Sequence, residues 1–260
     1  MLVKLGELII NFFTSVGIIF ILIGSIFKWM FKKPFDFKNI IKQMVHIGYD
    51  SIPVVFIISL FTGMVIALQT GLTLEKAFKG MSQFIGGVVA VSMARELAPV
   101  LTALIIAGRI GSSIAAEIGT MQVTEQIDAL KTLATNPVHY LAVPRFLALT
   151  FMLPCLAMFA DFIGWIGGAI VSVIELDTPF LTYYYHSQST LKMGDIVSGL
   201  IKSCFFGMII AIIGCYKGFN TKGGAEGVGK STTSAVVLSS ILILISDYFL
   251  TSFLNFTLKI

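Results

Sequence analysis

The length of its apolar stretches is the feature that most constrains what this chain can fold into. A helix needs about 20 mainly apolar residues to cross a lipid bilayer, and five stretches meet this requirement. They are Ser51–Thr70, Ser82–Gly111, Phe146–Ile174, Ile196–Tyr216 and Thr232–Phe256. Only 12% of the 260 residues are charged, whereas a soluble domain carries about a quarter. The pattern therefore predicts an all-α integral membrane protein with five transmembrane helices.

A sixth stretch, Ile9–Phe27, is apolar enough to cross but also contains several polar and small residues. It either crosses the bilayer or lies in the interface as an elbow. Lysines follow it between Lys28 and Lys42, together with Trp29 and Phe31, and this composition suits anchoring at the cytoplasmic interface. We favour an N-terminal interfacial elbow helix in residues 1–45, followed by a transmembrane domain in residues 46–260.

The distribution of lysine and arginine over the loops predicts the orientation. The Tyr216–Ser231 loop carries three lysines, and the Glu117–Arg145 loop also carries basic residues. By contrast, the Glu175–Asp195 loop has three acidic residues against Lys192. Because basic residues favour cytoplasmic loops, we place the first two loops in the cytoplasm and the third outside.

The second span contains charged residues near its middle. Arg95 and Glu96 carry opposite charges, and Pro99 follows them, where it is expected to kink the helix. In an uninterrupted helix Arg109 lies on roughly the same face as Arg95. Intramembrane ionisable groups usually face a cavity or a partner rather than lipid. These residues therefore either line a central cavity or lock helices together, and the two roles are compatible.

Three further charged residues lie within the spans. We place Lys202 near the outer end of its helix, where its long side chain can snorkel to the surface. Asp161 and Asp247 lie deeper, and each needs a partner or water. Because the three groups are scattered along the chain, a structural or cavity-facing role is favoured over a proton relay.

The Glu117–Ala134 segment resembles a short amphipathic cytoplasmic helix. Its apolar residues recur at helical spacing, with acidic residues on the other side: Val123, Ile127, Leu130 and Ala134 against Glu125 and Asp128. Such a helix either docks onto a cytoplasmic partner or rests on the membrane surface. Its acidic face favours docking, because the cytoplasmic leaflet is itself negative.

The Gly224–Ser231 run matches the phosphate-binding pattern G-x-x-x-x-G-K-[ST]. A P-loop needs a preceding strand and a soluble α/β domain, whereas apolar spans flank this run. We therefore predict a Gly-rich cytoplasmic turn that caps the last helix through Ser231 or Thr232.

No nucleophile–base pair or metal-ligand spacing is evident, so we expect no catalytic residue, metal or cofactor. A net charge of +4 gives no argument for nucleic-acid binding.

Several short runs together form the pattern of a known family. They are Ala94–Val100, Ala107–Arg109, Ala116–Met121, Thr124–Gln126, Asn136–Pro137, Pro144–Arg145 and Gly224–Ser231, followed by Thr232, Thr233, Val236, Val237, Ser239, Ser240 and Asp247. With these runs the chain resembles the MlaE family of ABC transporter permeases, from about Gly48 to its end. The resemblance implies a homodimer of five-span subunits in the cell inner membrane, each with an N-terminal elbow helix.

The resemblance also implies partners and a function. The expected partners are cytoplasmic ABC ATPase subunits and a periplasmic MCE-domain lipid-binding protein, with ATP hydrolysis confined to the ATPase. The expected substrates are phospholipids or related lipids, which move between the inner membrane and the periplasmic carrier. The alternatives are an ion-coupled secondary transporter, a channel and a membrane scaffold.

We assign two sets of candidate residues on this basis. The substrate cavity is expected to involve Arg95, Glu96, Pro99 and Asp247, of which Arg95 and Glu96 match the charged pair that the family places near its lipid cavity. Coupling to the ATPase is expected to involve a cytoplasmic helix that matches Glu117–Leu133. Its residues are Glu117, Val123, Glu125, Ile127, Asp128 and Leu130.

Overall fold

The computed structural model describes residues 2–32, 37–77 and 81–258, and all regular structure in these ranges is helical. Six helical stretches in the described residues are long and apolar enough to cross a membrane. They are Phe13–Met30, Phe37–Lys76, Met81–Val123, Val138–Ile174, Met193–Phe219 and Gly224–Thr257. The first overlaps the expected elbow, and each of the others contains one predicted span. The predicted all-α integral membrane class is therefore confirmed.

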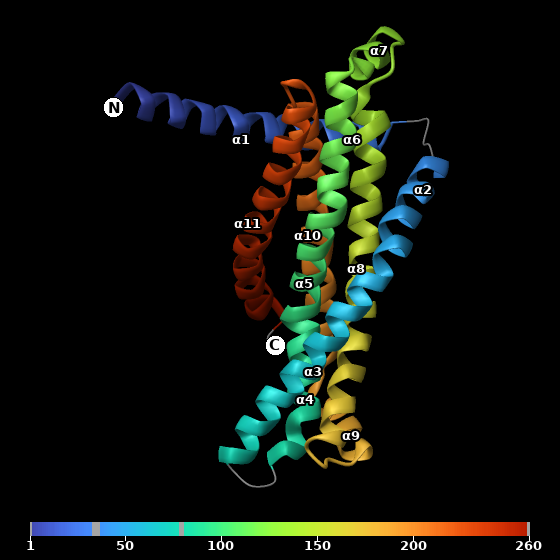
Figure 1. Ribbon diagram of the computed structural model, residues 1–260, viewed down its shortest axis with the longest axis vertical. Coiled ribbons are helices and arrows are strands. Elements are labelled where there is room, and N and C mark those ends of the chain that lie inside the picture. The colour runs from blue at the N-terminus through green and yellow to red at the C-terminus, as the bar shows by residue number, and fades with distance from the viewer. Residues whose placement is uncertain (1, 33–36, 78–80, 259–260) are drawn as a thin grey trace. The chain divides into compact units, whose positions relative to one another are not determined.

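The helices follow one another along the chain as labelled in Figure 1. Their bounds are α1 (Leu2–Met30), α2 (Phe37–Gly48), α3 (Ile52–Ala77), α4 (Ile85–Ser92), α5 (Ala98–Ile106), α6 (Ser112–Val123), α7 (Gln126–Thr132), α8 (Val143–Ile174), α9 (Phe180–Thr190), α10 (Met193–Phe219) and α11 (Gly224–Leu258). The described residues also contain two 3₁₀ turns, η1 (Tyr49–Ser51) and η2 (Met81–Phe84). Within the same ranges there are three π-helical turns, η3 (Met93–Leu97), η4 (Ala107–Gly111) and η5 (Val138–Ala142).

The chain forms two compact units, each assembled from three separate segments. Unit 1 contains Met1–Gln43, Ala107–Leu149 and Met208–Ser240, and unit 2 contains Met44–Ile106, Thr150–Gly207 and Ile241–Ile260. The N-terminal segment therefore belongs to a unit that also includes later parts of the chain. The domain boundary that we placed between residues 45 and 46 stays a prediction.

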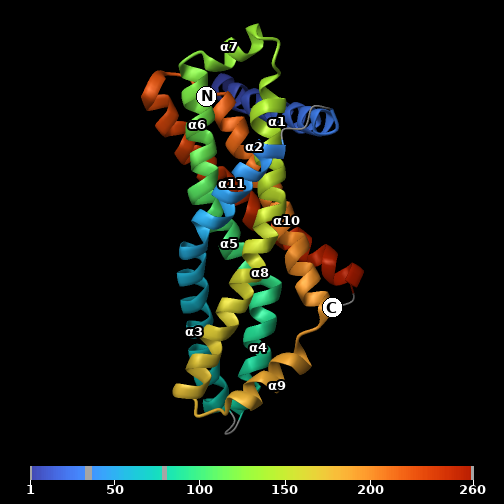
Figure 2. The same ribbon diagram turned by 90° about the vertical axis from the view of Figure 1, so that its right-hand side faces the viewer.

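In unit 1, helix α1 lies across α6 rather than along it (Figures 1 and 2). The C-terminal part of α1 is held by ring contacts: Phe27 lies 5.8 Å from Phe146 and Trp29 lies 5.6 Å from His139, centroid to centroid. Farther from these contacts, Phe20 is 68% exposed. A crosswise apolar helix with an exposed face supports the interfacial elbow, which stays a proposal for this segment.

Small residues bring α6 close to α10 within unit 1. A Cβ on Gly214 would lie 3.2 Å from the Gly111 carbonyl oxygen, and a Cβ on Gly218 would lie 2.6 Å from Cβ of Ile118. Close backbone approach is what small residues permit in a membrane. These glycines therefore allow a tight contact between the two helical segments, whereas nothing lies within 4 Å of a Cβ on Gly108.

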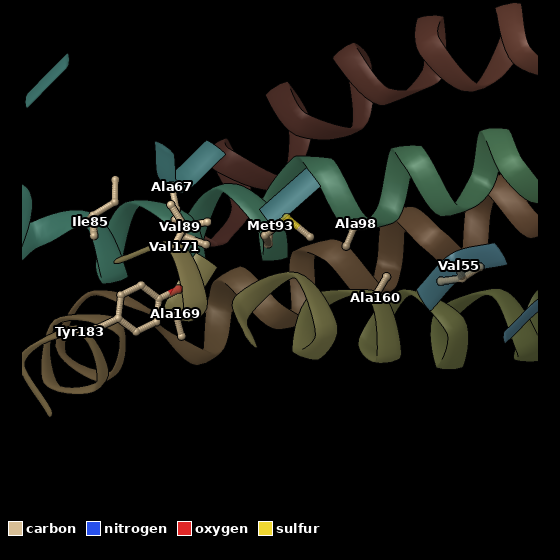
Figure 3. Packing of buried hydrophobic residues seen from close by; sticks show 10 residues of the cluster. All are labelled: Val55, Ala67, Ile85, Val89, Met93, Ala98, Ala160, Ala169, Val171 and Tyr183. Carbon is tan, nitrogen blue, oxygen red and sulfur yellow. The ribbon is translucent and has the colours of Figure 1, made fainter. Parts of the chain in front are cut away.

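The core of unit 2 is built from side chains of α3, α4, η3, α5, α8 and α9 (Figure 3). The cluster contains Val55, Ala67, Ile85, Val89, Met93, Ala98, Ala160, Ala169, Val171 and Tyr183. Tyr183 is fully buried, and its hydroxyl donates a hydrogen bond to the Trp165 carbonyl oxygen at 3.0 Å. Burial removes water from the phenol and so raises the pKa of Tyr183.

Helix α9 was missed by the sequence analysis, which treated Glu175–Asp195 as an outside loop. The helix packs against α4, where Gly86 faces the Tyr183 carbonyl oxygen and Gly87 faces the Thr190 side chain. Its polar composition gives no membrane-span signal. Two adjacent glycines on α4 leave the space that α9 occupies, and this tertiary fit is not visible in the sequence of α9 itself.

Replacing Gly63 by alanine is expected to destabilise unit 2 by about 1–3 kcal/mol, the usual cost of overpacking. A Cβ at Gly63 would overlap the Gly164 carbonyl oxygen of α8, and a backbone atom has little room to give way. The change is measured as the free energy of unfolding in mixed detergent micelles. Gly108→Ala is the matched control, because nothing lies within 4 Å of its added methyl group. An equal effect of both substitutions would contradict the close packing of Gly63 against Gly164.

Candidate functional site: a charged network beside an apolar groove

The site begins at the π turn η3, which carries Arg95 and Glu96. At the end of this turn the Ala98 N–H bonds to the Met93 carbonyl oxygen, five residues back. Pro99 then lacks the N–H that would reach the Arg95 carbonyl oxygen in an α-helix. A π turn is a frequent distortion at functional positions. The distortion expected near Pro99 therefore takes the form of a wide turn on its N-terminal side.

Helix α10 contacts two carbonyl oxygens of this turn, those of Ala94 and Arg95. Lys202 Nζ donates to the Arg95 carbonyl oxygen at 3.0 Å. Gly199 lies so close to the Ala94 carbonyl oxygen that a Cβ would overlap it. The Lys202 side chain is only 1% exposed. The expectation that Lys202 snorkels to the surface is therefore wrong, because its ammonium group points into unit 2.

Lys202 also joins two carboxylates that are far apart in the sequence. Its Nζ lies 2.7 Å from Glu96 Oε2 and 3.1 Å from Asp247 Oδ1. The Thr251 hydroxyl, one turn after Asp247, donates to Glu96 Oε1 at 3.2 Å. An ammonium group with two carboxylate partners and a carbonyl partner satisfies the requirement that buried charges be paired. Of the three charges that looked scattered in the sequence, Lys202 and Asp247 thus join Glu96 in one network from η3, α10 and α11, whereas Asp161 lies outside it.

Arg95 has a separate partner at the start of α10. Its Nη2 and Nε lie 2.6 and 2.7 Å from Asp195 Oδ1, and Asp195 Oδ2 accepts the Lys192 N–H at 2.9 Å. Asp195 is fully buried. We placed Asp195 in an outside acidic loop and did not predict this pairing. The sequence does contain one indication that Asp195 belongs to a helix, because its spacing of four and three residues to Gly199 and Lys202 puts all three on one helix face.

An apolar groove of about 440 Å³ borders the same π turn. Leu97 lines it together with residues of α3: Ile57, Ile58, Phe61, Thr62, Val65 and Ile66. The neighbouring Glu96 and Arg95 side chains keep 41% and 32% of their surface exposed. One turn therefore offers charged groups and an apolar wall in adjacent residues.

The structure brings three of the four proposed cavity residues into these networks. Arg95, Glu96 and Asp247 are all ion-paired. Pro99 is buried, and it contributes by leaving the Arg95 carbonyl oxygen to Lys202. Arg109 lies in the second π turn, η4. The π turns η3 and η4 interrupt the α-helix, so the prediction that Arg109 and Arg95 share one helix face, which assumed an uninterrupted helix, does not apply.

The predicted connector from Glu117 to Ala134 is two helices rather than one. Helix α6 continues to Val123, and the chain then breaks at Glu125, whose φ of 59° is left-handed. Helix α7 follows and ends before Ala134, which also has a positive φ of 55°. The apolar spacing that we extended across the whole segment therefore holds only within α7.

The six proposed coupling residues fall into different environments. Glu117 lies within α6, where its Oε2 pairs with Arg145 Nη2 at 2.7 Å. Val123 ends α6 and Ile127 is buried. The remaining three lie on the more accessible part of the connector: Glu125 and Asp128 are exposed and Leu130 is half-buried. Leu133, which we did not single out, is 74% exposed.

The P-loop lookalike Gly224–Ser231 forms the first turns of α11. Lys230 pairs with Glu226 one helical turn away at 2.7 Å, and the Thr221 hydroxyl donates to Ser231 Oγ at 2.9 Å. The interpretation of this run as a turn capped by Ser231 or Thr232 is therefore wrong, since the helix already begins at Gly224. The wide loop with which a P-loop surrounds phosphate is not the conformation of these residues.

Comparison with known proteins identifies the family of this chain. The family described as Permease MlaE matches residues 40–253, which is most of the chain. The chain belongs to the MlaE permease family.

Three relatives extend this assignment to particular proteins. A probable ABC transporter permease of Rickettsia prowazekii (strain Madrid E) is 47% identical over 96% of this chain and 98% of its own length. A probable ABC transporter permease of Synechocystis is 45% identical over 89% of this chain and 87% of its own length. The Arabidopsis thaliana protein TRIGALACTOSYLDIACYLGLYCEROL 1, chloroplastic, is 40% identical over 90% of this chain and 66% of its own length.

As an MlaE-family permease, the chain is a multi-pass membrane subunit of an ABC transporter. Such permease subunits are the membrane-spanning part of the transporter and are not themselves enzymes. The charged network and the groove lie in unit 2 and the connector with α7 lies in unit 1, all within the residues that the family match covers.

Proposed function

We propose that this permease moves phospholipids or related lipids between the inner membrane and a periplasmic carrier of MCE-domain subunits. In this proposal it works as a homodimer, and separate cytoplasmic ATPase subunits supply the energy. The resemblance to the family supports this assignment. The name of the Arabidopsis relative contains the name of a galactolipid, which supports a lipid as the substrate class.

One observation carries the proposal: the π turn η3 combines the two chemical characters of a lipid. Arg95 and Glu96 remain partly exposed while their partners Asp195 and Lys202 are buried. Leu97, the next residue, lines an apolar groove with α3. A head group can exchange hydrogen bonds with the charged residues while an acyl chain lies against the apolar wall. The proposed substrate-contact residues are Arg95 and Glu96, with Asp247 and Pro99 holding the network in place.

The connector provides the proposed point of attachment for the ATPase. The connector exposes two acidic side chains, Glu125 before α7 and Asp128 within it, where Asp128 pairs with Lys131 at 2.7 Å. The left-handed residue Glu125 sets α7 apart from α6. A left-handed non-glycine residue is strained and is tolerated where the surrounding structure fixes it. Movement of a bound ATPase can therefore act on α6 through a short and conformationally defined joint.

An ion-coupled transporter is the alternative function, and the partly exposed Lys202–Glu96–Asp247 network favours it, because intramembrane networks of this kind can carry protons. The two functions differ in their energy source. Transport by the permease alone in liposomes under an ion gradient would support the alternative and contradict an ATP-driven mechanism.

The test is ATP-dependent transfer of a fluorescent phospholipid from nanodiscs that contain the assembled complex to the MCE-domain carrier. Glu96→Gln is expected to reduce transfer about tenfold, the cost of losing one charged hydrogen bond. Glu175→Gln is the matched control, since Glu175 is an exposed acid in the same unit. Unchanged transfer in Glu96→Gln would count against the proposed site.

A further inference from the structure

Unit 2 contains a second cavity, of about 480 Å³, that shares no lining residue with the α3 groove. It lies among α4, η3, α8, α9 and α10. Its volume falls within the range of about 300–1,000 Å³ that is typical of small-molecule sites. Most of its lining is apolar, and Met158 is one of the residues that form the wall.

The cavity is lined by a carboxylate that lacks a partner. Asp161 comes from the middle of α8, and its Oδ1 is buried with no hydrogen-bond donor among the described residues. We expected Asp161 to need a partner or water, and the described part of the chain supplies no partner for its Oδ1. Because burying an unpaired carboxylate is costly, the position favours a ligand that brings a donor or a positive charge.

Aromatic rings stand beside this carboxylate. Phe162, Trp165 and Tyr184 all line the cavity, and the Trp165 ring lies 6.5 Å from Phe162 and 6.4 Å from Tyr184, centroid to centroid. The Trp165 Nε1–H already donates to Ser187 Oγ at 2.9 Å. A ligand therefore meets ring surface rather than a free indole donor, and aromatic faces attract cations, tryptophan most strongly.

The charge of the lining points in the same direction. Among the described residues that line the cavity, Asp161 is the acidic one, and none is a lysine or an arginine. Arg95 and Asp195 adjoin the lining residues Ala94 and Ile196 in the sequence, but they pair with each other at 2.6 Å. An unpaired carboxylate in an apolar environment favours a cationic ligand and disfavours an anionic one.

We infer that this cavity binds the protonated primary amine of a long-chain amphiphile. Asp161 accepts hydrogen bonds from the ammonium group, the Trp165 face lies against the cation, and the apolar wall takes the beginning of the chain. The amine can belong to a zwitterionic lipid head group or to a free long-chain amine. The inference concerns a cavity separate from the proposed transport groove and does not rest on lipid being the transported substrate.

The test uses the full-length permease in nanodiscs and a photoactivatable, alkyne-tagged long-chain primary amine. Labelling is expected on peptides of α8 and α9, and the carboxylic acid of the same chain length is expected to label them at least about tenfold less. Asp161→Asn should reduce amine labelling by a similar factor. It should also raise the thermal stability of the ligand-free protein, because it removes an unpaired carboxylate. Equal labelling by amine and acid, unaffected by Asp161→Asn, would overturn the inference.

A second variant separates the cavity from general exposure to lipid. Met158→Trp is expected to fill the cavity and abolish amine labelling, whereas Ile57→Trp, in the α3 groove, should leave it unchanged. Competition then identifies the source of the amine: displacement by phosphatidylethanolamine indicates a lipid head group, and displacement by dodecylamine alone indicates a free amine. Displacement by phosphatidic acid, which has no amine, would contradict the inference. Because no ATPase or carrier is present, failure here leaves the lipid-transfer test of the proposed function unaffected.

Discussion

Lys202→Met is expected to destabilise the permease by about 3 kcal/mol and to abolish transport. The substitution leaves Glu96 and Asp247 facing each other without the ammonium group that joins them, and it removes the partner of the Arg95 carbonyl oxygen. Removing one member of a buried ion pair typically costs about 3–5 kcal/mol. The lower end of this range is expected because Glu96 remains 41% exposed, so water can solvate its unpaired carboxylate. Unfolding in mixed micelles and lipid transfer by the assembled complex measure the two effects.

Lys192→Met is the control for this prediction. Lys192 is an exposed lysine just before α10, and its replacement is expected to change the free energy of unfolding by less than about 0.5 kcal/mol. Should the two lysine variants be equally stable, the inward placement of Lys202 would be contradicted.

A triple variant distinguishes a structural network from a substrate-contacting one. Adding Glu96→Gln and Asp247→Asn to Lys202→Met removes the unpaired charges together, which is far less costly than removing one partner. Most of the lost stability is expected to return, while transport stays lost because the proposed head-group contacts are gone. Recovery of both stability and transport would mean that the network only holds helices together.

Leu133→Asp and Glu125→Lys are expected to reduce ATP-driven transport at least about tenfold while leaving the permease itself folded. Leu133 is 74% exposed and Glu125 is exposed, so neither change removes buried packing. Glu125 already adopts a left-handed φ, and lysine, which also has a Cβ, adds no new backbone cost. Leu130→Asp is expected to abolish transport too, with some loss of α7 packing because Leu130 is half-buried.

Co-purification with the ATPase subunits and ATP-dependent lipid transfer measure this prediction. Glu226→Lys is the matched charge reversal, because Glu226 is 80% exposed and lies outside the connector. It is expected to keep both association and transport. Normal transport in Leu133→Asp and Glu125→Lys would remove the support for α7 as the coupling element.

The sequence by itself determined the class of this protein. Stretches of 20 or more apolar residues with few charges can only be accommodated as membrane helices, and each of the five predicted spans lies within an apolar helix long enough to cross. The runs around Arg95, Glu117 and Gly224 were sufficient to indicate the family. These are local properties of the chain, so they can be recognised without coordinates.

Tertiary structure alone decided how the charges are used. Lys202 and Glu96 are 106 positions apart, and Arg95 and Asp195 are 100 positions apart. No local pattern links such residues. The Arg95 carbonyl oxygen of the π turn η3 accepts a hydrogen bond from Lys202 of α10, and α9 packs into space left by two glycines of α4. Hydrophobicity and periodicity specify which segments enter the membrane, but the pairing of buried charges is a property of helices packed side by side.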